Sequence, residues 1–278
     1  MKISVILLAA LLAALGGVCV ARSEPPGALN PRNTIDLSGV SYVIVSTETS
    51  EIVEANWQRL DRPVPAGSLV KPFTALAYAE THSFRYPKLR CRGAEDECWL
   101  PKGHGSVGIE QALAQSCNTY FQYLADRVLW ADIETVARRF GLAAPPMDAP
   151  AGAYIGLGSE WKLQPLAVVR AYEELVRGSG NPGIERLLQG LALGSRGGTG
   201  SGIGRALDGA AALAKTGTST CSHLGDPERK ASNGDGYVIA LYPAEAPRYT
   251  MLVQVHGVPG RVAAIVGGKI LVRVVQGH

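Results

Sequence analysis

The chain is poor in charge, since Lys, Arg, Asp and Glu make up only 18% of its 278 residues and the net charge is +3. It has no lysine- or arginine-rich run, and therefore lacks the electrostatic footprint of a nucleic-acid-binding protein. We expect no nucleic-acid partner. The 46% of hydrophobic residues is enough for one large domain, or a compact pair of lobes, with a substantial core.

Sequence motifs for a metal ion or a nucleotide are also missing. The five histidines stand apart, and neither His-Glu-x-x-His nor Cys-x-x-Cys occurs, so we predict no metal site. In residues 198–204 glycine recurs at every second position, which fits neither the dinucleotide fingerprint nor the Walker pattern. We interpret this stretch as a mobile loop and expect no cofactor.

The N-terminus is typical of an exported protein. Met1 and Lys2 form a short positive region, residues 3–17 are mostly apolar, and Ala21 precedes a polar segment. This pattern predicts a secretory signal peptide over residues 1–21. A retained membrane anchor and a lipoprotein are the alternatives. We expect the protein in the periplasm or cell envelope, with a linker over 22–38 and one folded domain over 39–278.

Export makes the four cysteines of the folded domain candidates for disulfides. Cys91 and Cys98 flank a polar loop, so a local bridge between them is plausible. Cys117 and Cys221 could pair across a cleft, but two buried free thiols are an equally good interpretation.

Hydrophobic periodicity predicts strands at both ends of the domain and helices in the middle. The expected strands are a hairpin over 40–55 and the segments 209–218, 237–241 and 249–256. The expected helices are 109–114, 119–129, 133–140, 165–176 and 187–193, while 262–275 is a closing helix or a strand. This order predicts an α+β fold, in which helices flank an antiparallel sheet and an all-helical lobe is inserted.

The pair Ser68 and Lys71 is the first candidate for chemistry. Apolar residues from Leu69 to Ala77 recur at helical spacing, which places both side chains on one face in the first turn of a helix. A hydroxyl and an amine at a helix N-terminus can form an activated nucleophile if burial or a nearby cation lowers the pKa of the amine. In isolation, such a pair is more often a capping serine and a solvated lysine.

Two further motifs, Ser116-Cys117-Asn118 and Lys215-Thr216-Gly217-Thr218, follow in the same chain. Taken singly, Ser116 could cap the next helix and Lys215 could be an exposed strand lysine. In this order the three motifs resemble those of penicillin-binding proteins and β-lactamases. The chain is similar to the penicillin-recognising serine transpeptidases from about residue 39 to 275, which implies a transpeptidase-like catalytic domain.

The resemblance implies a role for each residue of the first two motifs. Ser68 would attack the carbonyl of a D-alanyl-D-alanine stem peptide of peptidoglycan and carry the acyl group, with Lys71 as the base. Ser116 would relay a proton to the leaving amine. Asn118 would bridge Lys71 and a substrate amide.

It also implies roles for the third motif. Lys215 would supply positive potential that suits a carboxylate and keeps a neighbouring amine unprotonated. Gly217 would let substrate lie along the strand edge, and the hydroxyls of Thr216 and Thr218 would bind the terminal carboxylate. Backbone N–H groups of Ser68 and Thr218 would form an oxyanion hole.

Within the family we expect a D,D-transpeptidase that penicillins acylate, with stem peptides, β-lactams and cell-wall synthesis proteins as partners. D,D-carboxypeptidase and serine β-lactamase are the alternatives. Residues 147–160 lack the paired glutamate and asparagine with which class A β-lactamases position water. An alternative of another class is a sensor of β-lactams or peptidoglycan that never turns over, or a cell-wall scaffold.

Overall fold

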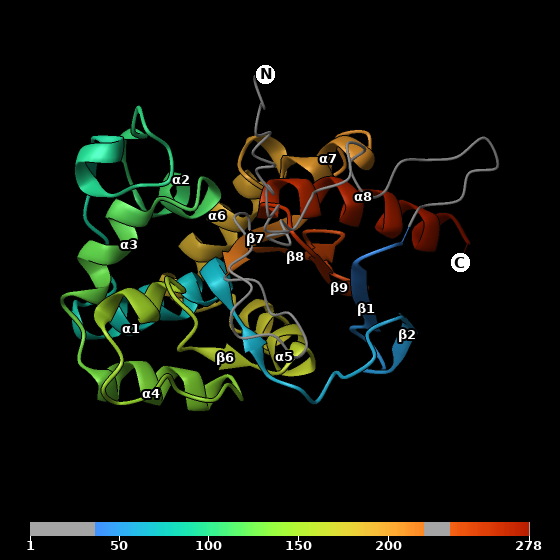
Figure 1. The fold of residues 1–278 in the computed structure, drawn as a ribbon, viewed down its shortest axis with the longest axis horizontal. Helices are drawn as coiled ribbons and strands as arrows, with labels where there is room; N and C mark the ends of the chain where they lie inside the picture. Colours follow the sequence, from blue (N-terminus) through green and yellow to red (C-terminus); the bar gives the residue numbers. More distant parts are fainter. Residues whose placement is uncertain (1–36, 220–233, 278) are drawn as a thin grey trace, which may run out of the picture.

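A five-stranded sheet organises the fold in the computed structural model, which describes residues 37–219 and 234–277 (Figure 1). Its strand order is β2-β1-β9-β8-β7, and each neighbouring pair is antiparallel. The strands are β1 Val40–Ser46, β2 Ile52–Ala55, β7 Leu213–Ser219, β8 Asp235–Tyr242 and β9 Tyr249–Val255. The predicted hairpin and the three later strands are thus confirmed, whereas the export signal and Cys221 lie outside the described residues.

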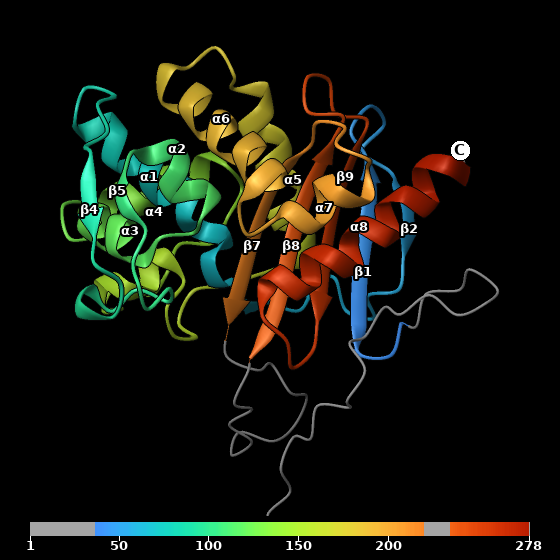
Figure 2. The same cartoon turned by 90° about the horizontal axis from the view of Figure 1, so that it is seen from above.

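Strand β8 shows how the two faces of the sheet are covered. Tyr237 and Ile239 belong to one hydrophobic cluster, whereas Val238 and Ala240 belong to the other. Because successive side chains of a strand point to opposite faces, β8 supplies two cores at once. Helix α8 (Gly260–Gly277) lies on one face and helix α5 (Pro165–Arg177) on the other (Figures 1 and 2).

A helical lobe inserted between β2 and β7 lies beside strand β7 (Figure 2). Besides α5, its helices are α1 Lys71–Thr81, α2 Ile109–Ala114, α3 Asn118–Ala125, α4 Trp130–Arg139 and α6 Pro182–Gly197, with 3-10 turns η1 Gly67–Val70, η2 Gly93–Asp96 and η3 Ala151–Ile155. The lobe also has two short antiparallel pairs, β3 Val64–Pro65 with β6 Lys162–Leu163 and β4 Leu89–Cys91 with β5 Gly105–Val107. The predicted α+β class is therefore confirmed, but the lobe is not purely helical.

The C-terminal segment forms a helix, which decides the alternative left open for residues 262–275. Its β-branched valines lower helix propensity, but burial against the sheet overrides that preference. Gly267 allows the close contact, since a Cβ atom there would lie 2.8 Å from Val238 Cγ1 of β8.

The glycine-rich stretch 198–204 is not the loop predicted from its sequence. Helix α6 extends to Gly197, and helix α7 (Ser201–Ala206) begins four residues later. A Cβ atom on Gly198 would lie 2.2 Å from the carbonyl oxygen of Ala114, and one on Gly202 would lie 2.6 Å from the amide nitrogen of Ile265. These glycines therefore permit close backbone packing of α7 and its neighbours.

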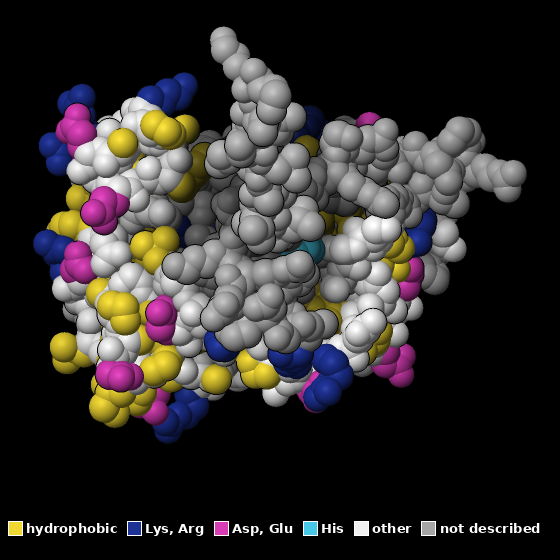
Figure 3. All heavy atoms as spheres, in the orientation of Figure 1, with side chains coloured by type: hydrophobic (Ala, Val, Ile, Leu, Met, Phe, Trp, Pro, Cys, Tyr) yellow, Lys and Arg dark blue, Asp and Glu magenta, His cyan; other side chains and the backbone are white. Residues whose placement is uncertain are grey.

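Within residues 37–219 and 234–277, none of the helices combines the length and the apolar character that a bilayer crossing requires. On the face drawn in Figure 3, the described basic and acidic side chains are interspersed around the rim. That face therefore carries mixed charge.

Replacing Gly202 by alanine tests the packing of α7 on α8. We expect Gly202→Ala to lower the free energy of unfolding by about 1–3 kcal/mol, because the new methyl group has backbone atoms in its way. The matched control is Gly197→Ala at the end of α6, where a Cβ atom meets nothing within 4 Å. Urea unfolding should show the control unchanged or slightly more stable; equal losses in both variants would contradict the packing argument.

Candidate active site

The three motifs converge on one pocket of about 270 Å³ between strand β7 and the helical lobe. Six of the eight predicted residues line it: Ser68, Ser116, Asn118, Thr216, Gly217 and Thr218. The other two, Lys71 and Lys215, are buried beside it and hydrogen bond to Ser116. The structure thus brings together all the residues selected from the sequence.

The sequence predicts that Ser68 lies in the first turn of an α-helix. In the structure it lies in the 3-10 turn η1, and the α-helix α1 begins three residues later, at Lys71. The turn is pressed against strand β7: Gly67 has φ +53°, and a Cβ atom there would lie 2.9 Å from the carbonyl oxygen of Thr218. On the lobe side, the hydroxyl of Tyr172 donates a hydrogen bond of 2.9 Å to the carbonyl of Leu69. These contacts fix Ser68 at the pocket wall.

Lys71 is fully buried, and its amine faces the second motif. The Nζ atom donates to Asn118 Oδ1 (2.7 Å) and to the carbonyl of Ser116 (3.0 Å), and it lies 3.4 Å from Ser116 Oγ. Burial lowers the pKa of Lys71 from 10.5 to about 7, and the thiols of Cys117 and Cys98 oppose that shift. An amine with this pKa is partly neutral at physiological pH and can accept a proton.

Lys215 is also buried, so the alternative of an exposed strand lysine is wrong. Its Nζ atom donates to Ser116 Oγ at 2.9 Å and to the carbonyl of Thr216 at 2.6 Å. Burial, followed by the charge of Lys71, holds the pKa of Lys215 well below its usual value. Ser116 Oγ therefore lies between two buried amines whose pKa values are both lowered.

Ser116 adopts a left-handed backbone conformation with φ +53°, which is uncommon for a residue with a side chain. It is not the cap of the following helix, because Cys117 occupies the N-cap position and Asn118 is the first residue of α3. The indole of Trp99 donates a hydrogen bond of 3.1 Å to the carbonyl of Ser116. Strained residues of this kind concentrate at functional sites.

The third motif lies on β7, the edge strand of the sheet next to the lobe. A Cβ atom on Gly217 would lie 3.3 Å from the amide nitrogen of Ser68, so a side chain there would crowd the first motif. Thr218 is exposed and its Oγ1 accepts a hydrogen bond of 3.0 Å from the amide of Gly260. Thr216 Oγ1 donates to Thr199 Oγ1 at 2.5 Å.

Several pocket residues could not be found by sequence reasoning. They are Trp99, Leu157, Thr199, Pro259, Gly260 and Arg261. Each lies outside the three motifs, and Thr199 belongs to the stretch interpreted as a loop. Among the described lining residues none carries a carboxylate, so the side-chain charge in this part of the pocket is that of Arg261.

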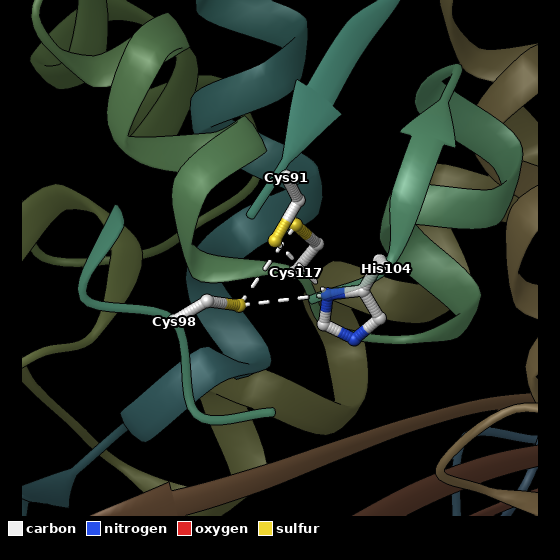
Figure 4. A group of neighbouring side chains, drawn as sticks. All are labelled: Cys91, Cys98, His104 and Cys117. Atoms are coloured by element: carbon white, nitrogen blue, oxygen red, sulfur yellow. Dashed lines mark hydrogen bonds between the residues drawn. The ribbon is translucent and has the colours of Figure 1, made fainter. Parts of the chain in front are cut away.

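The cysteines do not form the predicted local bridge. Cys91, Cys98 and Cys117 are free thiols. Cys98 Sγ lies 4.0 Å from Cys117 Sγ, whereas bonded disulfide sulfurs are about 2.05 Å apart. Together with His104 they form a compact group of ligand-type side chains (Figure 4). Its members are several residues apart in the chain, so the search for short metal motifs missed them.

The depressed pKa of Lys71 makes stability depend on pH. Between about pH 7 and pH 10.5 the unfolded chain binds more protons than the folded chain, so the free energy of unfolding rises with pH. A full one-proton difference gives a slope of about 1.4 kcal/mol per pH unit. We expect Lys71→Met to lose this rise. The free energy of unfolding of the wild type should therefore increase relative to that of the variant as pH rises from about 7 to 10.5.

Chemical unfolding at a series of pH values measures that slope. The charged and titratable groups facing the Lys71 amine are Lys215, Cys98 and Cys117. Lys215→Met provides a second variant with the same expected direction, because the pKa of Lys215 is also lowered. Stability curves that stay parallel to the wild type in both variants would contradict the assigned pKa shifts.

Comparisons with known proteins agree with this geometry. The family described as "Penicillin binding protein transpeptidase domain" matches residues 38–182, which is more than half of the chain. A search of curated protein sequences finds no match.

Solved structures of penicillin-binding proteins share the fold. Penicillin-binding protein 2 of Pseudomonas aeruginosa, in complex with WCK 5153, is 19% identical with a TM-score of 0.68, over 84% of this chain and 71% of the other. The transpeptidase domain of Burkholderia pseudomallei penicillin-binding protein 3 is 15% identical with a TM-score of 0.68, and the match covers 86% of this chain and 88% of that domain. PBPA of Mycobacterium tuberculosis is 20% identical with a TM-score of 0.63, and the match covers 85% of this chain and 76% of that protein.

Both the family match and the shared fold lead to one assignment. The chain belongs to the penicillin-binding protein transpeptidase domain family.

Proposed function

We propose that the protein is a serine D,D-transpeptidase that forms an acyl-enzyme on Ser68 and is acylated by penicillins. The observation that carries the proposal is the amine of Lys71, buried beside the pocket, hydrogen bonded to Asn118 and Ser116, with its pKa lowered to about 7. A neutral amine at this position can take the proton of the serine hydroxyl at physiological pH.

In the first half-reaction, Ser68 Oγ attacks the carbonyl carbon between the two D-alanines of a stem peptide. Its proton passes to Lys71 Nζ, and the negative charge on the carbonyl oxygen is stabilised by the backbone N–H groups of Ser68 and Thr218. The C–N bond then breaks. The leaving amine receives a proton through Ser116 Oγ, which accepts a hydrogen bond from Lys215 and lies 3.4 Å from Lys71 Nζ.

The second half-reaction releases the serine. An acceptor amine from another stem peptide attacks the ester carbon, loses a proton to the same lysine and serine relay, and the C–O bond to Ser68 breaks. A new amide bond forms, and the hydroxyl regains its proton. Attack by water in place of the amine would give a D,D-carboxypeptidase.

The pocket wall supports binding of a peptide with a terminal carboxylate. The edge strand β7 borders the pocket, and Gly217 leaves room for a substrate backbone to lie beside it. Thr218 and Arg261 line the pocket and supply hydroxyl and guanidinium donors for the carboxylate, and Thr216 joins them when its hydroxyl turns from Thr199 to the substrate. Asn118 donates to a substrate amide carbonyl while its Oδ1 accepts from Lys71.

A β-lactamase is less well supported, because among the described residues that line the pocket no carboxylate is available to activate a hydrolytic water. PBPA of Mycobacterium tuberculosis, a structure of the same fold, is known as acyl-enzyme complexes with a cephalosporin and with imipenem. We propose the same type of adduct on Ser68.

Export to the periplasm or cell envelope and association with other cell-wall synthesis proteins belong to the same proposal. Penicillin-binding protein 2 of Helicobacter pylori, of the same fold at 16% identity, forms a complex with MreC, but this chain covers only 60% of that protein.

Intact-mass measurement after exposure to benzylpenicillin tests the nucleophile. We expect the wild type to gain the mass of one penicillin per chain and Ser68→Ala to gain none, because only Ser68 Oγ can form the ester. The matched control is Ser179→Ala, an exposed serine in the turn between α5 and α6, which should label like the wild type. Equal labelling of Ser68→Ala, or no labelling of the wild type, would refute the acyl-enzyme on Ser68.

Product analysis on a pentapeptide stem identifies the acceptor. With an added amine acceptor, we expect the cross-linked product to exceed the hydrolysed tetrapeptide, because the described pocket offers no carboxylate to activate water. A tetrapeptide as the sole product would identify a carboxypeptidase. A stable penicillin adduct without any peptide product would identify a sensor.

A further inference from the structure

Four side chains outside the proposed catalytic chemistry meet in the helical lobe. They are Cys91 at the end of β4, Cys98 after η2, His104 before β5 and Cys117 at the N-cap of α3 (Figure 4). Their ligand atoms all lie within 4.8 Å of one another, and the three cysteines are buried. Three thiols and an imidazole turned toward one point are the donor set of a structural zinc site.

The separations between the donor atoms fit a tetrahedral ion. Bonds of about 2.3 Å to sulfur and 2.0–2.1 Å to nitrogen place tetrahedral ligand atoms about 3.5–3.8 Å apart. His104 Nδ1 lies 3.5 Å from the sulfurs of both Cys91 and Cys98, and Cys98 Sγ lies 4.0 Å from Cys117 Sγ. The sulfur–sulfur distance of 4.0 Å is too long for a disulfide, and the three distances together leave room for one ion at the centre.

We propose that Cys91, Cys98, His104 and Cys117 bind one structural zinc ion. The site is closed, since four protein ligands fill a tetrahedral shell and leave no position for water or substrate. Its role is therefore to hold the chain, with no chemistry of its own. The interpretation from sequence that the chain has no metal site is replaced by this assignment.

A hydrogen-bond donor beside one of the sulfurs supports a thiolate ligand there. The hydroxyl of Thr119, in the first turn of α3, donates a hydrogen bond of 3.2 Å to the sulfur of Cys91. A donor of this kind stabilises a coordinated sulfur and fixes its orientation.

The site would connect two parts of the lobe that no regular hydrogen-bond ladder joins. Cys91, Cys98 and His104 belong to the segment that contains β4, η2 and β5, whereas Cys117 lies between Ser116 and Asn118 of the second motif. A metal bond at Cys117 fixes the backbone on both sides of it. That includes Ser116, whose left-handed conformation orients its hydroxyl toward the two lysines.

Metal analysis of the purified protein tests the assignment. We expect about one zinc ion per wild-type chain by plasma mass spectrometry. The zinc content should fall at least about tenfold in Cys98→Ser and in His104→Gln, because each substitution removes a ligand. His82→Gln is the matched control for His104→Gln, because His82 lies at the C-cap of α1 outside the group, and this variant should keep its zinc.

Cobalt gives a second measurement that needs no variant. Wild-type protein stripped of metal and loaded with Co²⁺ should show thiolate-to-cobalt charge-transfer bands and the intense visible bands of a tetrahedral ion. Wild-type protein without metal, or with a disulfide between any two of the three cysteines in non-reducing peptide mass spectrometry, would overturn the proposal. Zinc retained in both Cys98→Ser and His104→Gln would also overturn it.

The effect on catalysis rests on the proposed function. Removing zinc from the wild type with a chelator should slow acylation by benzylpenicillin about tenfold or more, and adding Zn²⁺ should restore it. Zinc content and the cobalt spectrum are read without any substrate. A protein that binds zinc but never acquires a penicillin adduct would refute the acyl-enzyme and not the metal site. A purified wild-type protein that acquires the adduct but contains no zinc would refute the metal site and not the acyl-enzyme.

Discussion

The active-site architecture depends on the burial of two lysine amines around one serine hydroxyl. Lys71 and Lys215 come from different parts of the fold, a helix of the lobe and the edge strand of the sheet, and both contact Ser116 Oγ. Desolvation lowers the pKa of each amine, and the charge of Lys71 lowers the pKa of Lys215 further. This arrangement requires the lobe and the sheet to approach closely, so close backbone contacts recur around the pocket. A Cβ atom on Gly194 of α6, for example, would lie 2.6 Å from the carbonyl oxygen of Ala214 in β7.

Much of this architecture could be predicted from the sequence because its signals are local. Alternation and helical periodicity identify the strands and most helices, and the order of three short motifs identifies the eight predicted site residues. The glycine stretch 198–204 misled the prediction, since glycine serves both flexible loops and tight packing, and only the neighbours distinguish the two. Helix α7 uses Gly202 to approach the backbone of Ile265 in α8, a contact between segments about sixty residues apart.

Features built by tertiary contact alone could not be predicted in this way. Trp99 and Arg261 reach the pocket from a loop and from the start of α8, and neither position has a motif. The same holds for the cysteines, whose spacing in the chain suggested a local disulfide. In the folded chain, Cys117 comes from another segment and lies 4.0 Å from Cys98. Ligands separated by long and irregular intervals form a site only after the elements between them have folded.

The second motif combines several features that oppose its own stability. Ser116 has a left-handed backbone, α3 begins without a side-chain cap, and the amines beside it are desolvated. Other contacts must offset these terms for the hydroxyl to keep its place, and the indole of Trp99 supplies one through the carbonyl of Ser116. The proposed zinc site supplies another at the neighbouring residue, since a bond at Cys117 restrains the backbone without placing a charged side chain in the pocket. On this argument the proposed metal acts by limiting the positions available to Ser116. A closed site next to the pocket is therefore compatible with the proposed reaction of serine and lysine side chains.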